Sequence, residues 1–406
     1  MRRLQAALRD ETAIAVTFLV NGVVFASLLP RLPQIKAQLD LGDAAFGLAL
    51  MGAGLGGLAG SLLAPRIMRR LSERRTVIVA GVALALSGLA PPVVATAPAG
   101  TAAPVLALGL AVLLIGLSDA VHDVSMNVVA LGAQRRRGTT IMGRLHGLWS
   151  AGAVAAGAVG ALAAAHDVPV LLHLAAACSL AALAQLFVAP ALPRVSTPAV
   201  AVPSGPGVRR AAPWAVLAVV GVAAALIEGP PQEWSAVYLF EGLGTGPGLA
   251  GMAPVSFTAA MLVSRLLADR WIDRWGAAAV ARAAGVIVAA GAALGLWVSG
   301  TTGSPLAALV GFAIVGFGAA PVFPLMFMAA ERLPGMAHGS GVGAVSAVAR
   351  AGFLGVSPLI GVVSEAVGLA WALSVIALGG LAATVALPPR LAPPAGDAAA
   401  EAPART

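Results

Sequence analysis

The chain has 406 residues, of which 59% are hydrophobic and only 10% are charged. A soluble protein carries about 25% charged residues, so this composition excludes an ordinary soluble domain and indicates a polytopic membrane protein. The net charge of +8 does not indicate nucleic-acid binding, because most arginines lie between apolar runs, where they set membrane topology.

Apolar windows, separated by glycine, proline and charged residues, predict twelve membrane-spanning helices. In chain order they cover residues 12–36, 43–67, 74–96, 102–132, 139–165, 168–189, 213–240, 247–270, 277–299, 303–331, 338–365 and 367–388. Each is long enough to cross a hydrocarbon core of roughly 30 Å as a helix. The first apolar run is followed by many others, so we expect an uncleaved first span rather than a signal peptide.

The spans predict an all-α membrane protein made of two pseudo-symmetric six-helix bundles. The bundles cover residues 1–190 and 213–390, with a Pro-, Ser- and Gly-rich linker at 191–212 and a tail at 391–406 of disordered composition. The segment "LLAPRIMRR" (62–70) is repeated as "LLADRWIDR" (266–274). An internal repeat with a central linker is typical of two halves around a midplane site.

Arginine placement predicts the orientation. Arginine clusters follow the even-numbered spans, at 66–75, 135–137, 209–210 and 270–282, and Arg332 follows the tenth span. Because cytoplasmic connections carry the excess of basic residues, both termini and the linker are expected in the cytoplasm of a multi-pass inner-membrane protein.

The fourth span contains an unusual polar stretch, "DAVHDVSMN". Asp119, Asp123 and Asn127 are four residues apart and share one helical face, and His122 lies one turn from Asp119. A single carboxylate at the centre of a membrane helix costs about 2.5–3.5 kcal/mol, so this face must meet protein or water. A solute pathway supplies that water; the alternative is a structural network in which Asp119 pairs with His122 and Asp123 with a neighbouring Arg.

The seventh span contains a second polar stretch, "IEGPPQEWSAVY". Gly229, Pro230 and Pro231 predict a break in the helix, and broken helices in transporters mark the site or its gate. The side chains around this break are candidate substrate contacts: Glu228, Gln232, Trp234 and Tyr238. The alternative is that Glu233, Trp234 and Tyr238 belong to an interfacial belt.

Three further candidates lie in other spans. Arg350 is the only Arg placed well inside a predicted span, so we expect it to face the cavity, either on the substrate or paired with Glu228 or Asp123. His146 and Trp149 lie near the start of the fifth span, within reach of the same cavity.

The sequence offers no basis for enzymatic chemistry. Cys178 is the single cysteine, which excludes an intramolecular disulfide. His122 and Asp119 are too few ligands for a metal, and the glycine runs lack the strand and Lys of a phosphate loop. No serine lies in a nucleophile-elbow sequence, so neither a cofactor nor an enzyme is expected.

Two motifs carry a family resemblance. The segment "LLADRWIDRWG" resembles the loop motif of the major facilitator superfamily, and the first-half copy has Pro65 where the motif has Asp. The segment "GLSDAVHDVSMN" resembles the fourth span of the fucose-permease-like branch, with Asp123 and Asn127 in its acid-to-Asn spacing. Where that branch has a second acidic residue in its first span, this chain offers Asn21.

The resemblance implies a secondary transporter that works by alternating access, with proton-coupled uptake of a sugar- or polyol-like solute. Asp123 and Asp119 are then the proton-coupling candidates. The substrate-binding candidates are Asn21, His122, Asn127, His146, Trp149, Glu228, Gln232, Trp234, Tyr238 and Arg350, and the gating candidates are Asp269, Arg270 and Arg274. The expected partners are a small solute, a proton and the lipid bilayer, around a monomer.

Two other functions compete with this interpretation. The first is an efflux antiporter for drugs or metabolites, against which the fifth span "GLWSAGAVAAGAVG" lacks the Gly-Pro pair of the antiporter motif. The second is a membrane-embedded enzyme or a non-transporting receptor, for which no nucleophile, metal cluster or sensor domain is visible.

Overall fold

The computed structural model describes residues 2–96, 104–137, 141–194, 211–331 and 340–387, and every regular element in these ranges is a helix. Eleven helical segments in them are long and apolar enough to cross a membrane. A further helix, α9 (Ala211–Glu233), lies where the seventh span is predicted. The predicted all-α membrane fold is therefore confirmed, although the tail at 391–406 and most of the linker lie outside the described residues.

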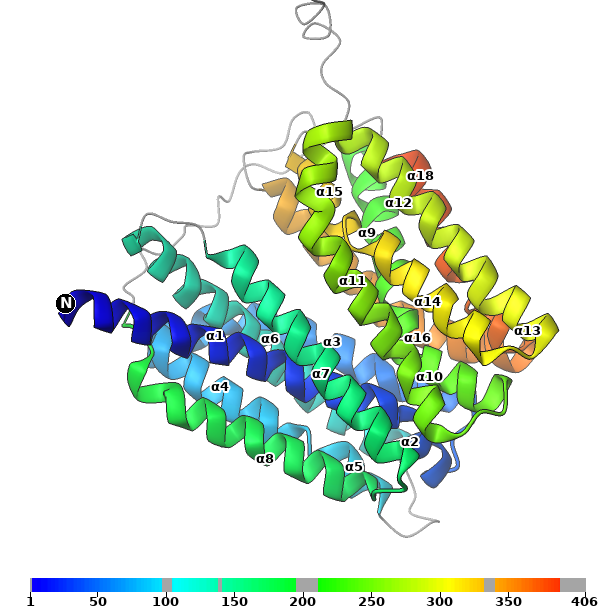
Figure 1. Cartoon of the computed structure of the whole chain (residues 1–406), viewed down its shortest axis with the longest axis horizontal. Helices are drawn as coiled ribbons and strands as arrows, with labels where there is room; N and C mark the ends of the chain where they lie inside the picture. The colour runs from blue at the N-terminus through cyan, green and yellow to red at the C-terminus, as the bar shows by residue number, and fades with distance from the viewer. Residues whose placement is uncertain (1, 97–103, 138–140, 195–210, 332–339, 388–406) are drawn as a thin grey trace, which may run out of the picture.

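The helices form two groups that occupy separate regions of Figure 1, one blue to green and one green to red. The first comprises α1 (Arg2–Leu28), the 3-10 turn η1 (Leu29–Arg31), α2 (Leu32–Gln38), α3 (Asp43–Leu71), α4 (Glu73–Ser87), α5 (Ala90–Ala95), α6 (Pro104–Arg137), α7 (Met142–Ala165), α8 (Val170–Val188) and η2 (Ala189–Ala191).

The second group begins with α9. It continues with α10 (Ser235–Val237), the π-helix η3 (Tyr238–Gly242), α11 (Pro247–Trp275), α12 (Ala277–Ala292), the π-helix η4 (Ala293–Val298), α13 (Ser299–Thr302), α14 (Pro305–Ala319), α15 (Val322–Glu331), α16 (Ser340–Val367), α17 (Leu369–Ala372) and α18 (Val375–Ala386).

Helices α3 and α11 carry the sequence repeat into the structure. Both have 29 residues, and both are preceded by a glycine in extended conformation, Gly42 and Gly246. Both also end at a residue with positive φ, Ser72 at 72° and Gly276 at 78°. Glycine adopts this conformation without steric cost and serine does not, so the first copy keeps the turn at some strain.

The expected break at Gly229–Pro231 is wrong. Helix α9 runs through both prolines to Glu233, and the chain departs from regular α-helix only at Trp234. Proline removes an N–H donor but keeps its carbonyl. The carbonyl of Pro230 accepts the Trp234 N–H at 2.9 Å, and that of Pro231 accepts the Ser235 hydroxyl. The irregular segment is instead the π-helix that follows.

The two bundles are in close contact at one end. A methyl group on Gly47 of α3 would lie 2.3 Å from the Ser357 carbonyl oxygen of α16, and one on Gly248 of α11 would lie 2.4 Å from Ala165 Cβ of α7. Because glycine has no side chain at these two positions, the helix backbones can approach closely. We call this end, which includes Lys36 and Asp43, the closed side.

The bundles diverge toward the opposite end, as the helices at the upper left of Figure 1 show. Here α7 carries Gly143 and Gly147, and a methyl group on either would meet no atom within 4 Å. We call this end, which includes the end of α11 and the start of α7, the open side.

Candidate functional site

Asn21 of α1 is the centre of a polar network inside the first bundle. Its Nδ2 donates to Asp119 Oδ1 at 2.9 Å and lies 3.1 Å from His122 Nδ1, both on α6. Its Oδ1 accepts from Trp149 Nε1 of α7 at 2.7 Å. Asn21 is buried and Asp119 half-buried, so the carboxamide fixes this carboxylate, the imidazole and the indole relative to one another.

Asp123 and Asn127 continue the polar face of α6. Asn127 Nδ2 donates to Asp123 Oδ1 at 3.0 Å and to the Asp123 carbonyl at 2.9 Å. Both side chains are half-buried. In the alternative structural network Asp119 pairs with His122 and Asp123 with an Arg; in the structure Asn21 links Asp119 to His122, and Asn127 of the same helix holds Asp123.

Arg350 of α16 faces this polar surface from the second bundle. Its guanidinium acts electrostatically on both Asp119 and Asp123. Among the described residues, no ion pair within 4 Å joins it to either carboxylate. A cation on one bundle thus faces two carboxylates on the other, without a direct salt bridge.

Arg265 of α11 is a site residue that the sequence reasoning missed. Its Nη2 lies 3.6 Å from Glu228 Oε1 of α9, and its Nη1 lies 3.5 Å from Ser150 Oγ of α7. The expectation that Arg350 is the only Arg well inside a span is therefore wrong, and of the alternatives left open for Arg350, pairing with Glu228 is taken by Arg265. The signal was present in the span "MLVSRLLADR", where Arg265 follows four apolar or small residues.

The other candidates of the seventh span point away from the Asn21 network. Trp234 is fully buried at the closed side, where its ring meets Phe46 edge-on and its Nε1 donates to Ser357 Oγ at 3.1 Å. Tyr238 is buried in the second bundle, hydrogen-bonded to the Leu296 carbonyl at 3.0 Å. Glu233, assigned to an interfacial belt, instead accepts a hydrogen bond from Ser357.

Gln232 and His146 lie on more accessible surfaces. Gln232 is half-buried and its Nε2 donates to the Glu228 carbonyl at 3.2 Å. His146 is exposed on α7 near the open side, with its ring edge-on to Phe18 at 5.4 Å.

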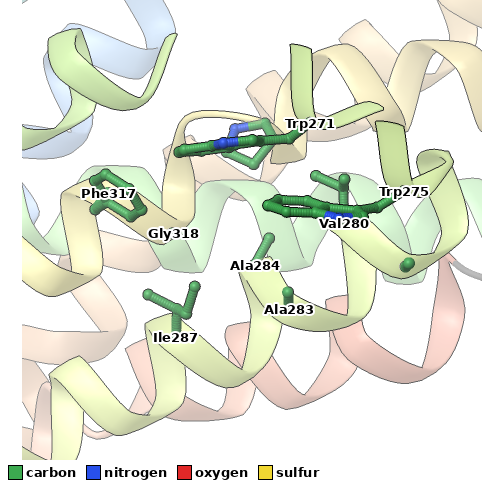
Figure 2. Close-up of a pocket in the computed structure, with 10 residues that line it drawn as sticks. Trp271, Trp275, Val280, Ala283, Ala284, Ile287, Phe317 and Gly318 are labelled. Carbon is green, nitrogen blue, oxygen red and sulfur yellow. The ribbon is translucent and has the colours of Figure 1, made fainter. Parts of the chain in front are cut away.

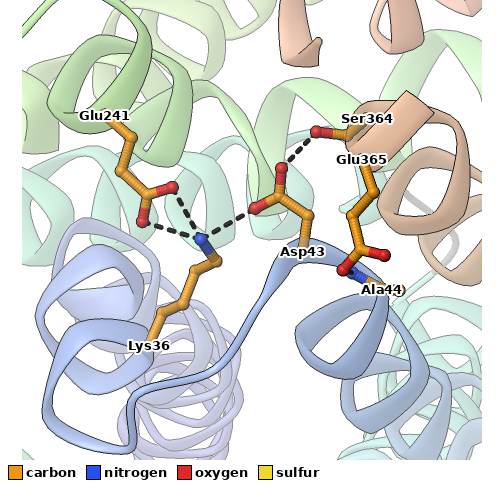
Figure 3. A network of polar contacts seen from close by, with 6 residues as sticks. All are labelled: Lys36, Asp43, Ala44, Glu241, Ser364 and Glu365. Carbon is orange, nitrogen blue, oxygen red and sulfur yellow. Dashed lines mark hydrogen bonds and ion pairs between the residues drawn. The ribbon is translucent and has the colours of Figure 1, made fainter. Parts of the chain in front are cut away.

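The closed side carries a charge network that joins the two bundles and that no sequence pattern indicated (Figure 3). Lys36 Nζ lies 2.7 Å from Asp43 Oδ1 and 2.6 Å from Glu241 Oε2, so one cation bridges α2, α3 and η3. Ser364 of α16 donates to Asp43, and Glu365 accepts from the Ala44 N–H at 3.0 Å. Lys36 is the only lysine of the chain, which is the signal that could have singled it out.

The predicted gating residues lie at the open side. Asp269, Arg270 and Arg274 are exposed at the end of α11. Within the described part of the chain, none of the three takes part in an ion pair within 4 Å. Arg274 lies instead 6.0 Å from the centre of the Trp275 ring.

An apolar cavity of about 390 Å³ lies beside this helix end, between α11, α12 and α14. Figure 2 shows the rings of Trp271 and Trp275 above Ala284 and Ile287, with Val280 beside the Trp275 ring. Because none of the described residues that line it is charged, this cavity does not suit a polar solute.

Comparison with known proteins identifies the family of this chain. The family model described as Major Facilitator Superfamily matches residues 234–406. The chain is 32% identical over 371 residues to the uncharacterized transporter y4wD of Sinorhizobium fredii, covering 90% of this chain and 93% of the relative. It is 28% identical over 382 residues to an uncharacterized MFS-type transporter of Yersinia pestis, covering 92% and 94%.

Solved transporters share the fold at low sequence identity. The nucleoside transporter NupG superposes with a TM-score of 0.69 at 12% identity, covering 96% of this chain and all of that one. The inward-open xylose transporter XylE of E. coli gives 0.72 at 15% identity, covering 94% and 95%. The fold and its polar surfaces thus define a multi-pass membrane transporter. The chain belongs to the Major Facilitator Superfamily.

Proposed function

We propose that this transporter is a proton-coupled symporter that carries a small polar solute, sugar- or polyol-like, across the inner membrane. The observation that carries the proposal is the Asn21 network, which holds Asp119 beside Asp123 on the bundle surface that faces Arg350. Two membrane-embedded carboxylates are too costly to serve packing alone, and such residues mark ion and substrate pathways.

In this proposal Asp123 carries the coupled proton, and the neighbouring Asp119 influences how readily Asp123 binds it. Asn127 donates to the Asp123 carboxylate, and the positive charge of Arg350 faces it from the other bundle. Protonation of Asp123 weakens the attraction across the bundles, which links proton binding to their separation. The resemblance of Asp123 and Asn127 to the fucose-permease-like pattern supports the same role.

The substrate contacts come from both bundles. Asn21, His122, Asn127, His146 and Trp149 supply hydrogen-bonding groups and an aromatic plane on the first bundle. On the second they face Glu228, Gln232 and Arg350. Trp234 and Tyr238 are buried in this conformation, so any contact they make belongs to the conformation in which the closed side has opened.

Alternating access then opens the closed side and closes the open side. The open side carries the arginine-rich segments 66–75 and 270–282, which supports a cytoplasmic location and hence an inward-open conformation. The Lys36 network holds the outer side shut. Asp269, Arg270 and Arg274 form their ion pairs when the inner side closes instead.

Transport by the purified full-length chain in proteoliposomes tests the function. A panel of labelled pentoses, hexoses, nucleosides and polyols is offered with an inward or an outward proton gradient. Symport predicts accumulation of one class when the outside is acidic. An efflux antiporter predicts accumulation under the opposite gradient, and absence of any gradient-driven movement across the panel contradicts a transporter of this substrate class.

A further inference from the structure

The surface of the first bundle that faces away from the second bundle has a cavity that the proposed transport site does not use. It has a volume of about 430 Å³ and lies between α1, α7 and α8. Most of its lining is apolar, as in Ala155, Val159 and Ala176, but His173 and Ser27 also line it. Leu172 and Leu180 on its rim are strongly exposed, so in a membrane the cavity opens to lipid.

Two buried side chains beside one end of this cavity carry nitrogen atoms without a hydrogen-bond partner among the described residues. His173 is 6% exposed, and neither ring nitrogen has a hydrogen-bond partner among the described residues. Arg31 is fully buried; its Nη2 donates to the Val168 carbonyl at 2.6 Å, while Nε and Nη1 have no partner there. A buried guanidinium with two unused donors is unfavourable unless an anion neutralises it.

His173 lines one end of the cavity, and Arg31 lies behind that lining, in contact with it. Val168, which accepts from Arg31, is itself part of the lining. A methyl group on Gly160 would lie 3.2 Å from Pro30, the neighbour of Arg31, and 3.3 Å from His173 Cε1. Pro30 and the His173 imidazole therefore flank one glycine of α7, and the guanidinium of the next residue, Arg31, reaches the Val168 carbonyl in the connection between α7 and α8.

The apolar part of the cavity extends from this polar end along the helices. On α8 the lining residues Leu172, Ala176 and Leu180 recur every four residues, so they form a strip along one face. The polar end lies at the start of α8, near the membrane surface, and the strip runs toward the middle of the bilayer. This is the layout of a head group followed by a hydrocarbon chain.

We propose that this cavity binds a membrane phospholipid. The phosphodiester accepts hydrogen bonds from Arg31 and His173, its negative charge neutralises the guanidinium, and one acyl chain lies along the α8 strip. A charge-assisted Arg–phosphate pair is the strongest contact available to these two donors. The site is independent of the transported solute, because it faces the bilayer rather than the surface between the bundles.

Native mass spectrometry of the full-length protein, titrated with phosphatidylglycerol, tests this site. The comparison ligand is diacylglycerol with the same acyl chains, which lacks the phosphate. We expect wild type to retain one phosphatidylglycerol at least about tenfold more tightly than diacylglycerol. Arg31→Gln should abolish that difference, and Ala176→Trp, which fills the strip and leaves the polar end intact, should reduce retention of both lipids.

The matched control is His166→Leu, an exposed histidine at the same end of α7 that does not line the cavity. It should bind phosphatidylglycerol as wild type does. If Arg31→Gln fails to fold, Ala176→Trp decides the question. Equal retention of the two lipids by wild type, or undiminished phosphatidylglycerol binding by folded Ala176→Trp, overturns the proposal.

Discussion

Replacing Lys36 by Met should open the closed side of the transporter. Lys36 is the single cation that holds Asp43 of the first bundle and Glu241 of the second, at 2.7 and 2.6 Å. Methionine keeps the length of the apolar stem but removes the charge. The two carboxylates then repel each other across the boundary between the bundles.

The magnitude follows from burial. Hydrogen bonds to charged groups contribute about 1.5–3 kcal/mol each when desolvated. The Lys36 and Asp43 side chains are only 6% and 18% exposed, but Glu241 is 35% exposed, so solvent screens the second pair and we count it at half or less. Lys36 and Asp43 both belong to the first bundle, so only the Lys36–Glu241 pair is broken when the bundles separate. Its contribution of about 1 kcal/mol corresponds to a shift of roughly fivefold in the equilibrium between the two conformations.

Cysteine labelling measures this shift. The native Cys178 is replaced by Ala to give a cysteine-free background. One reporter, Val255→Cys, is buried where α11 meets Gly157 of α7, and the other, Gly143→Cys, lies exposed at the open side. In the Lys36→Met background, maleimide should react roughly fivefold faster at position 255 and more slowly at position 143.

The control is Arg136→Gln, which removes an ion pair with Asp10 at 3.9 Å inside the first bundle. It should leave both labelling rates unchanged. If Lys36→Met also leaves both rates at their wild-type values, the Lys36 network does not hold the bundles together, and the magnitude derived above is wrong.

Three further predictions concern packing, the polar network and the inner gate. Gly47→Ala should raise labelling on the closed side, because its Cβ would lie 2.3 Å from the Ser357 carbonyl, whereas Gly147→Ala, which meets nothing within 4 Å, should not. Asn21→Ala should lower the free energy of unfolding by about 1–3 kcal/mol, since Asp119 and Trp149 lose their hydrogen bonds to this buried side chain; an unchanged melting temperature contradicts the network. Asp269→Asn should favour the conformation open at its end of α11 and slow turnover; unchanged labelling there makes it a loop charge only.

The fold was predictable because its signals are local. Length and apolarity define each span, and the repeat at 62–70 and 266–274 reappears as two helices of 29 residues with matching ends. The helix through Pro230 and Pro231 was not predictable from proline content alone. A helix tolerates the missing N–H donors when the proline carbonyls still accept hydrogen bonds from the following turn, as that of Pro230 does from Trp234.

The site was predictable in composition but not in pairing. The spacing of Asp119, Asp123 and Asn127 identified one polar face, and Asn127 does contact Asp123 one turn away. The pairs that depend on tertiary packing were missed, since Lys36 meets a residue 205 positions away and Ser364 one 321 positions away. No local pattern encodes such a contact.

Solute accumulation by Asp123→Asn in proteoliposomes tests the proton-coupling role most directly. Asparagine has the shape of the protonated acid but cannot release a proton, so solute exchange at equal concentrations should continue while accumulation driven by a pH gradient is lost. The matched control, Asp167→Asn, changes an exposed carboxylate after α7 and should accumulate solute as wild type does. Gradient-driven accumulation by a folded Asp123→Asn variant would contradict the coupling role of Asp123.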